Sequence, residues 1–473
     1  TPVLHENLAS YENLRLPLPD LPNVHSHTQW KTGEPETGFA ESDFFFEQTF
    51  TTQRVHHGYL EPHAVVVRVD SSGRFLVSSP SKGPYATREQ LADWMGIDQT
   101  KIAFQLNPIG GDFGGKGSLM DIPLCCYLAK ATGRPVKMLM SYAEELNAAT
   151  PRHPSIITIK TGVKKDGRLW ARKVRALFNS GAYAAIKNNV TINLPGARSG
   201  AGAYKIPHVS IDAMSVYTNC VPSGIMRAPG EAQMMFAVES HMDHMARELG
   251  MDPYEFRHRN VLDGQPAAGG GVHVENDKAK ELLEKVRAEF RWNQAKATKR
   301  YLGRGLALCV REVGPGESNV EVGIKPDGRV YILTTIPDTG TGSHTIFRQI
   351  VGEPLANRAE TIDVVLGTTD SFVTDHMIGG SRVTYLVGQA AVSAASRLRS
   401  RLNEMAAERF RCPASSIHIS QGIVSGPNKN KISFSALASE AASRGMTLRE
   451  SGNFAASERA EDVSFFAQAA EVE

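Results

Sequence analysis

The stretch NPIGGDFGGKGSLMD, residues 107–121, constrains the fold of this chain most strongly, because it holds four glycines within six residues. The apolar run KIAFQL before it predicts a strand, and LMDIPLCCYLAKATG, which overlaps its end, predicts a helix. Gly110, Gly111, Gly114 and Gly115 allow positive φ angles and a close approach of the backbone to a ligand. Amides near the start of a helix can bind an anion. The loop is therefore either an anion-binding loop or a tight turn without a ligand.

Gly110 to Lys116 also fits the P-loop pattern G-x-x-x-x-G-K. A P-loop needs Ser or Thr directly after the lysine, because that hydroxyl ligates Mg²⁺. Gly117 stands there instead, Ser118 comes one residue late, and Phe113 would put a bulky ring inside the phosphate cradle. No clear strand ending in a magnesium-binding aspartate follows, so a P-loop ATPase is disfavoured.

The composition is that of a globular protein. A length of 473 residues predicts two or three domains, and 41% hydrophobic and 22% charged residues are ordinary values. The net charge of +2 indicates no nucleic-acid partner. No run of 18 apolar residues is found, so we expect no membrane span, and the first residues show no signal peptide, which favours a cytoplasmic location.

The five cysteines are too few and too scattered for a disulfide framework. No CxxC pair occurs, which argues against a structural zinc site or an iron–sulfur cluster held by this chain. We expect five reduced, buried thiols.

Strand and helix patterns alternate irregularly along the chain. Three strand–turn–strand patterns predict hairpins at 64–79, 155–178 and 319–336. Apolar residues every three to four positions predict a helix over 231–249, with Gly250 at its C-cap and a short helix from Asp252-Pro253. Other predicted helices cover 277–290 and 388–410, and a capping box of Thr87 and Gln90 predicts the start of a short helix. This mixture favours an α+β fold.

The Gly-rich segment PAAGGGV, 266–272, predicts a domain boundary. We therefore expect a first domain over 1–265 with an extended lead-in over 1–45, a linker and helix over 266–300, and a second domain over 301–473. The last residues, DVSFFAQAAEVE, alternate like a strand and then stop, which indicates one part of a larger polypeptide or one subunit of a split enzyme.

Five sequence blocks together carry a family resemblance. IGGDFGGK resembles the GGGFGGK loop of the xanthine dehydrogenase/aldehyde oxidase family, the molybdenum hydroxylases. Four further blocks agree with that family in order and spacing: HHGYLEPHA (56–64), VPSGIMRAPG to FRHRN (221–260), DTGTGSHT (338–345) and GGSRVTYLVGQA (379–390). The resemblance implies two molybdopterin-binding domains made of mixed sheets with packed helices.

The resemblance also implies the cofactors and the residues that hold them. The expected cofactor is molybdopterin, in its plain or cytosine dinucleotide form, with [2Fe-2S] clusters and FAD on an iron–sulfur subunit and an FAD subunit. Phe113 and Arg227 are implied beside the molybdenum as catalytic residues. The implied cofactor-binding residues are Gly111, Asp112, Phe113, Gly114, Arg227, Gly340, Thr341, Gly342, Ser381, Arg382 and Thr384. No side chain is implied as a metal ligand.

Departures from the family pattern fall in the implied substrate pocket, at Lys82, Gly117 and Pro229. Gly117 replaces a glutamate that binds purines, and Pro229 replaces a phenylalanine that sandwiches them. Lys82 falls where a glutamine near the molybdenum oxo group is usual, and Gly224 replaces the cysteine of carbon monoxide dehydrogenases. Thr341 stands where a cofactor-contacting glutamine is usual. Xanthine and carbon monoxide are therefore disfavoured as substrates.

The implied activity is oxidation of an aldehyde or N-heteroaromatic substrate, with water as the oxygen source. The family's general base is a glutamate in a GVGE-type motif, and no GVGE occurs in this sequence. We therefore expect this chain alone to be inactive, either because a further chain carries the missing segment or because this chain is a fragment. The alternative is a non-catalytic scaffold subunit of the same fold that has lost the cofactor site.

The remaining candidate residues favour structural roles. His241 and His244 lack a third metal ligand at fixed spacing and are expected to be solvated or packed. The methionines of 231–249 are expected in the core, and Arg152 is expected to act as scaffold. HHGYLEPH is expected to be a strand near the cofactor channel, and RLRSR, 397–401, one face of a helix.

Overall fold

The computed structural model describes residues 18, 20–21, 23–183, 191–263, 278–292, 302–457 and 463–473. The chain divides into two compact units, each made of separate segments. Unit 1 contains Thr1–His57, Asn147–Val313 and Ala460–Glu473, and unit 2 contains Gly58–Leu146 and Gly314–Arg459. The predicted Gly-rich boundary at 266–272 lies outside the described residues, and the predicted domain limits remain a prediction.

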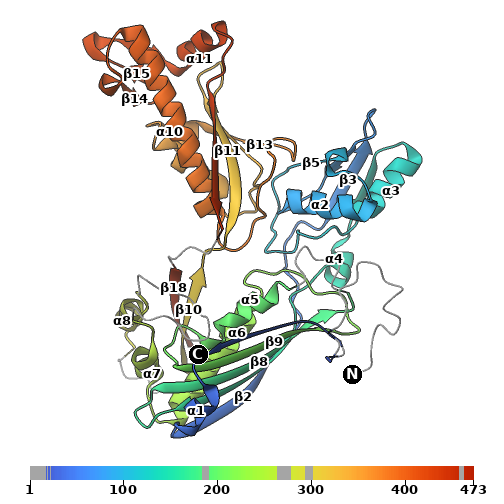
Figure 1. The fold of residues 1–473 in the computed structure, drawn as a ribbon, viewed down its shortest axis with the longest axis vertical. Coiled ribbons are helices and arrows are strands. Elements are labelled where there is room, and N and C mark those ends of the chain that lie inside the picture. The colour runs from blue at the N-terminus through green and yellow to red at the C-terminus, as the bar shows by residue number, and fades with distance from the viewer. Residues whose placement is uncertain are drawn as a thin grey trace. The chain divides into compact units, whose positions relative to one another are not determined.

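A five-stranded sheet forms the centre of unit 1 (Figure 1). Its strand order is β1 (Val24–Thr32), β9 (His208–Tyr217), β8 (Leu169–Gly181), β7 (Ser155–Val163) and β2 (Phe44–Thr52). β8 and β9 run parallel, and the other neighbours are antiparallel. The hairpin predicted over 155–178 is confirmed as β7 and β8. The lead-in expected over 1–45 was wrong for its later part, because β1 and α1 (Pro35–Ala40) form there.

The long helix α6 (Glu231–Glu248) packs against the sheet and confirms the helical pattern. Met234, Met242 and Met245 are fully buried, so their predicted place in the core is confirmed. His241 is also buried, between Gln48 Oε1 at 2.9 Å and Thr161 Oγ1 at 3.1 Å, as a packed residue rather than a metal ligand.

Two further helices and a pair of strands belong to unit 1. α7 (Pro253–Asn260) begins after Asp252, whose carboxylate accepts from the Tyr254 amide at 2.8 Å and caps the helix, as the sequence predicts. α8 (Ala279–Glu289) confirms the helix expected over 277–290. The terminal strand is confirmed as β18 (Val463–Val472), which pairs with β10 (Gly303–Glu312).

Unit 2 contains a small mixed sheet in the order β5 (Ile102–Gln105), β4 (Phe75–Ser78), β3 (Ala64–Val69) and β6 (Val136–Leu139). α2 (Pro84–Met95) and α3 (Ile122–Thr132) pack with this sheet, and the predicted 64–79 hairpin is confirmed. The predicted capping box was wrong. α2 begins at Pro84 with Gly83 as its N-cap, and the Thr87 hydroxyl donates to the Gly83 carbonyl one turn back.

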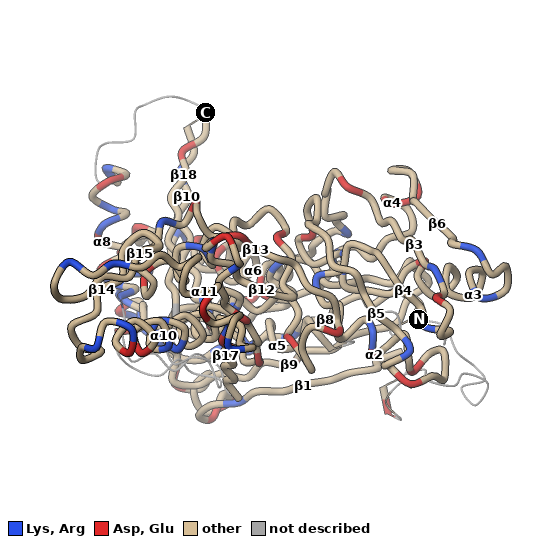
Figure 2. Tube along the Cα trace, turned by 90° about the horizontal axis from the view of Figure 1, so that it is seen from above, with Lys and Arg blue, Asp and Glu red and all other residues tan. Residues whose placement is uncertain are grey.

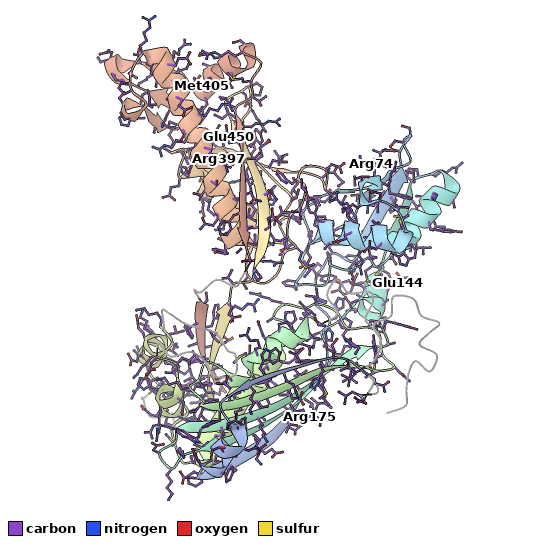
Figure 3. The ribbon with its side chains drawn as sticks, viewed as in Figure 1. Arg74, Glu144, Arg175, Arg397, Met405 and Glu450 are labelled. Carbon is purple, nitrogen blue, oxygen red and sulfur yellow. The ribbon has the colours of Figure 1, made fainter. Side chains whose placement is uncertain are left out.

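A second sheet of unit 2 has the order β13 (Ile362–Leu366), β12 (Val330–Thr334), β11 (Gly316–Ile324) and β17 (Arg449–Ala456). The hairpin predicted over 319–336 is confirmed as β11 and β12. α9 (Ser343–Gly352) and α10 (Val383–Phe410) pack on the sheet, as Figure 1 shows for α10 and β11. Arg401 of α10 pairs at 3.0 Å with Glu450 of β17. Glu450 is labelled in Figure 3.

Two local expectations differ from the structure. HHGYLEPH forms no strand, because residues 56–62 have irregular backbone between an isolated bridge at Val55 and β3. The cysteines are free thiols, as expected, but Cys220 is exposed and Cys309 and Cys412 are only half-buried.

Charged residues of both signs are interspersed along the described chain (Figure 2). The basic run 397–401 lies on α10, with Arg397 and Arg399 exposed and Leu398 buried between them, so the prediction of a helix face is confirmed. None of the helices in the described ranges has the length and apolar character needed to cross a membrane.

Candidate functional site

The glycine loop joins β5 to α3 through an unusual backbone path. Gly111 and Gly114 have φ angles of +90° and +107°, which L side chains rarely adopt. Phe113 between them has a φ of +48°, and its side chain is 47% exposed. A bulky residue in the left-handed region is held there only by its surroundings, which makes Phe113 a candidate functional position.

Asp112, within the loop itself, holds the backbone in this path. The Asp112 carboxylate is buried and accepts from the amides of Gly114 at 2.8 Å and Lys116 at 2.9 Å. The amide of Gly115 donates to the Asp112 carbonyl at 2.9 Å. These amides are therefore already used within the loop. The expectation that the glycine amides bind an external anion stays a prediction, and at Gly114 and Gly115 it would require these bonds within the loop to be exchanged.

Glu61 anchors the other side of the loop. Its carboxylate accepts from the Gly110 amide at 2.8 Å and from the Lys116 ammonium at 2.5 Å. Lys116 also lies 4.7 Å from the centre of the Tyr59 ring. A Cβ added to Gly111 would lie 2.9 Å from Tyr59 Cβ, so only glycine fits against this segment. Lys116 is thus committed to Glu61 and is not placed as a phosphate-binding P-loop lysine.

A buried network below the loop was missed from the sequence. Glu145 is fully buried and accepts from the His63 amide at 2.7 Å, from His63 Nδ1 at 2.9 Å and from the Tyr59 hydroxyl. Burial opposes the charge on Glu145, but the hydrogen bonds from His63 and Tyr59 outweigh it and hold its pKa at about 2. Glu145 is 82 positions from His63, and no local pattern signals this contact.

The segment 338–344 meets the glycine loop directly. The Ile109 amide donates to the Asp338 carbonyl at 2.9 Å, and the Asp338 carboxylate accepts from the Gly340 amide at 2.8 Å. Gly340 and Gly342 have φ angles of +91° and +77°, and a Cβ on either would enter open space. Glycine is therefore required at these two positions by the positive φ angles and not by close packing. Ser343 follows with a buried hydroxyl that has no hydrogen-bond partner in the described part of the chain.

The segment 377–384 forms a third part of the same unit. Gly380 and Ser381 have φ angles of +67° and +57°, directly before α10 begins at Val383. The Arg382 guanidinium donates to the carbonyls of Pro315 and Met377, which leaves its Nε buried and without a partner among the described residues. Thr384, in the first turn of α10, is exposed.

The segment that carries Lys82 joins these parts. The Lys82 amide donates to the Lys116 carbonyl at 3.0 Å, and the Lys82 carbonyl accepts from the Ile378 amide at 2.8 Å. The Lys82 side chain is only 2% exposed and lies against Gly117. Unit 2 therefore brings together four of the predicted segments, around Lys82, Asp112, Gly340 and Arg382.

The predicted residues Arg227 and Pro229 lie on a loop of unit 1. Arg152 confirms its scaffold role by donating to the carbonyls of Arg227 at 2.6 Å and Ala228 at 3.3 Å. Ala228 has a φ of +59°, and the Arg227 side chain is exposed. His57 Nε2 lies 2.7 Å from the Ile225 carbonyl and fixes the start of the loop.

Two glycines show how tightly this loop is packed. A Cβ on Gly224 would lie 2.3 Å from Thr150 Oγ1, so no side chain, a cysteine included, fits there without movement. A Cβ on Gly230 would lie 2.1 Å from the Asn193 carbonyl oxygen, and the φ of Gly230 is +74°. The backbone around Arg227 is therefore fixed by contacts at both ends.

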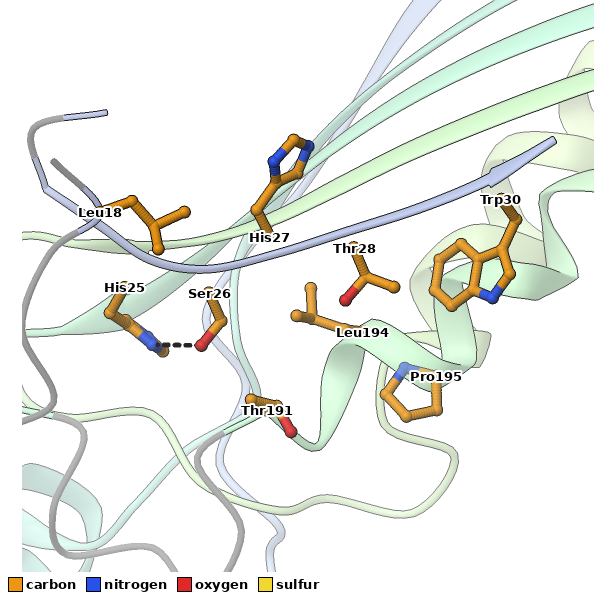
Figure 4. A pocket seen from close by; sticks show the side chains of 9 residues that line it. All are labelled: Leu18, His25, Ser26, His27, Thr28, Trp30, Thr191, Leu194 and Pro195. Atoms are coloured by element: carbon orange, nitrogen blue, oxygen red, sulfur yellow. Dashed lines mark hydrogen bonds between the residues drawn. The ribbon is translucent and has the colours of Figure 1, made fainter. Parts of the chain in front are cut away.

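Unit 1 also contains a cavity of about 240 Å³ beside β1 and α5 (Asn193–Ala197) (Figure 4). His25, Ser26, Trp30 and Leu194 line it, and His25 Nδ1 lies 2.9 Å from Ser26 Oγ. None of the predicted site residues lines this cavity. Within the described ranges, no group of three or more His, Cys, Asp and Glu side chains could hold a metal ion.

The residues gathered in unit 2 fit an anionic, oxygen-rich cofactor. Lys82 supplies a buried positive charge, the half-buried Arg382 supplies a second one with a buried Nε, and Ser343 supplies a hydroxyl that lacks a partner in the described chain. The open space beside Gly340 and Gly342 leaves their backbone accessible at close range. Charged and hydroxyl donors of this kind suit phosphate and oxo groups held without a protein ligand to the metal.

Comparisons with known proteins point in the same direction. Two models described as molybdopterin cofactor-binding domains match residues 18–261 and 278–473. The chain belongs to the molybdenum hydroxylases of the xanthine dehydrogenase and aldehyde oxidase type, and resembles their large subunit. This family assignment confirms the sequence prediction and the α+β class.

One curated relative is a probable xanthine dehydrogenase subunit of Bacillus subtilis (strain 168). It is 30% identical over 405 residues, which cover 84% of this chain and 54% of the relative. The chain thus spans about half of that protein's length.

Two solved structures share the fold. A Cu,Mo-CO dehydrogenase matches with a TM-score of 0.87 and 20% identity, over 100% of this chain and 64% of that one. The aldehyde oxidoreductase of Desulfovibrio gigas matches with a TM-score of 0.82 and 24% identity, over 96% of this chain and 50% of that one. At these identities the likeness is one of fold.

Proposed function

We propose that this chain is the molybdopterin-binding part of a molybdenum hydroxylase that oxidises an aldehyde or an N-heteroaromatic substrate, with water as the oxygen source. The observation that carries the proposal is the convergence in unit 2 of the segments around Asp112, Gly340 and Arg382, which three of the family's sequence blocks supply, with the segment around Lys82. The name of the Desulfovibrio aldehyde oxidoreductase supports the aldehyde class, and that of a nicotinate dehydrogenase large molybdopterin subunit of Eubacterium barkeri, 33% identical over 270 residues, supports the N-heteroaromatic class.

The proposed cofactor contacts are the backbone of 111–114 and 340–342 and the side chains of Ser381 and Arg382. Ser343 adds a hydroxyl that the sequence did not single out. When bound, molybdopterin would supply the two-electron redox chemistry and the activation of a water-derived oxygen. The chain would hold and orient it: Asp112 keeps the loop of Phe113 in its strained path, and Arg382 brings a positive charge to the anionic group. Thr384 and Thr341 are exposed and complete the proposed set.

Arg227 and Phe113 remain the proposed residues beside the molybdenum. Gly117, Pro229 and Gly224 support substrates other than purines and carbon monoxide, because none offers the carboxylate, ring or thiol implied for those reactions. Iron–sulfur and FAD subunits are the proposed electron acceptors, in keeping with the names of relatives as subunits of larger enzymes.

The test is oxidation by the co-expressed complex in ¹⁸O-labelled water, followed by mass spectrometry of the product. An aldehyde or N-heteroaromatic substrate should gain the label from water. Label that enters only from dioxygen, or turnover that persists in molybdenum-free protein, would overturn the proposal.

A further inference from the structure

Lys82 is a buried lysine in a rigid setting. Its side chain is 2% exposed, and hydrogen bonds at both its amide and its carbonyl fix its backbone. Gly83 lies next to it, where a Cβ would come within 2.7 Å of Met377 Cβ. The backbone that carries Lys82 is therefore held in place on both sides of the residue.

Gly117 makes the room that Lys82 uses. A Cβ at position 117 would lie 2.7 Å from Lys82 Cε, closer than real Cβ contacts. Any residue larger than glycine at 117 would therefore displace the lysine stem. The φ of Gly117 is not in the left-handed region, so the glycine serves the lysine and not the backbone. The two residues form one structural unit.

The Lys82 ammonium has neither a hydrogen bond nor an ion pair with any residue that the structure describes. Asp112 acts on it electrostatically, but the Asp112 oxygens already accept from the amides of Gly114 and Lys116. Burial lowers the pKa of Lys82, the charge of Asp112 opposes that shift, and the charge of Arg382 adds to it.

Arg382 also has a hydrogen-bond donor without a partner in the described chain. Its Nε is buried without a partner among the described residues, while its Nη atoms hold two carbonyls. Lys82 is 2% exposed and Arg382 has this buried Nε, and two such neighbouring cations cost folding free energy unless an anion lies between them. The natural occupant is a group with negatively charged oxygens.

We propose that Lys82, accommodated by Gly117 and assisted by Arg382, is an anion-recognition residue that binds a negatively charged oxygen of a ligand. That oxygen belongs either to a carboxylate on the substrate or to the molybdopterin itself. The inference rests on the proposed function for the identity of these ligands. The anion site itself follows from Lys82, Gly117 and Arg382 alone.

The first experiment uses the purified full chain without the enzyme reaction. Inorganic phosphate and benzoate are titrated at constant ionic strength, and binding is followed by calorimetry. Lys82→Gln and Lys82→Met should bind at least about tenfold more weakly than the wild type, because one charge-assisted hydrogen bond is lost. Lys130→Gln is the matched control on the exposed end of α3 and should bind like the wild type.

The Tm of the variants is a second readout, and it can be measured without any ligand. Lys82→Met keeps most of the volume and removes the unpaired charge, so its Tm without ligand should exceed that of the wild type. Gly117→Ala should lower the Tm, and Gly117→Ala/Lys82→Met should restore part of the loss, because methionine has no ammonium to bury.

The co-expressed complex separates the two sources of the oxygen. If the substrate carries it, Lys82→Gln should raise KM for 4-carboxybenzaldehyde relative to its methyl ester, with molybdenum content unchanged. If the cofactor carries it, molybdenum and pterin content should fall and the KM ratio should stay constant. Unchanged anion binding together with a lowered Tm in Lys82→Met would overturn the inference, whether or not the complex contains molybdenum.

Discussion

Replacing Asp112 by alanine should release the glycine loop from its strained path. The carboxylate accepts from the amides of Gly114 at 2.8 Å and Lys116 at 2.9 Å inside the protein. A hydrogen bond to a charged acceptor contributes about 1.5–3 kcal/mol. Gly114 is only half-buried and regains some water, so we expect a total loss of about 3 kcal/mol for the two bonds.

That loss is measurable as a thermal shift of unit 2. For a unit of this size, a change of 1 kcal/mol moves Tm by about 2–4 °C, so Asp112→Ala should lower Tm by about 6–12 °C. Hydrogen exchange followed by mass spectrometry should show faster exchange in the peptide that covers 110–118. Because Asp112 also compensates the Lys82 charge, Asp112→Ala/Lys82→Met should recover part of the lost stability.

Asp93→Ala on the exposed face of α2 is the matched control, since it removes a carboxylate without a buried partner. The reasoning would be refuted if Asp112→Ala had the same Tm as Asp93→Ala and the hydrogen exchange of residues 110–118 were unchanged. In that case the loop would keep its path through contacts other than the Asp112 carboxylate.

Three further perturbations test other parts of the structure. Burial, together with the Arg172 charge, holds the pKa of His241 at about 3, so only the unfolded chain binds this proton below pH 6.5. The free energy of unfolding should therefore fall by about 2 kcal/mol between about pH 7.5 and pH 5, and chemical denaturation of His241→Gln should show a shallower slope with pH. Gly230→Ala should lower the yield of folded protein severely, because its Cβ would lie 2.1 Å from a backbone carbonyl, whereas Gly250→Ala, at a φ of +66° in open space, should cost only about 1 kcal/mol. Glu145→Gln should cost about 3 kcal/mol at neutral pH in urea unfolding. Since the pKa of Glu145 is held at about 2, this difference should persist above about pH 4.5 and shrink as the pH falls towards 2, and a difference constant across that range would count against the network.

Local sequence patterns predicted the regular elements because each pattern carries its own physics. Turns such as Lys325–Gly328 lie between alternating strands, and all three predicted hairpins formed. The 3.6-residue period and Gly250 located α6 within two residues of its observed end. The wrong capping box shows the limit of such local patterns. Proline is favoured at the first position of a helix, so α2 begins at Pro84, before Thr87 could act as its N-cap.

The candidate site was less accessible from the sequence, because its parts are distant along the chain. The sequence identified the glycine loop. No local pattern indicated that the Asp112 carboxylate would accept hydrogen bonds from the loop amides, or that Lys116 would form an ion pair with Glu61. Glu145 and His63 were missed for the same reason, since their contact spans 82 positions. Lys82 and Lys116 are both buried, and only the structure shows that Lys116 pairs with Glu61 whereas Lys82 pairs with no described carboxylate.

The molybdenum and pterin content of this chain, purified in complex with its co-expressed neighbouring subunits, tests the central claim most directly. Metal analysis by mass spectrometry and the fluorescence of oxidised pterin should give equimolar molybdenum and pterin per chain, reduced in Arg382→Ala and unchanged in Arg397→Ala. An intact, folded complex that holds neither molybdenum nor pterin would contradict the account.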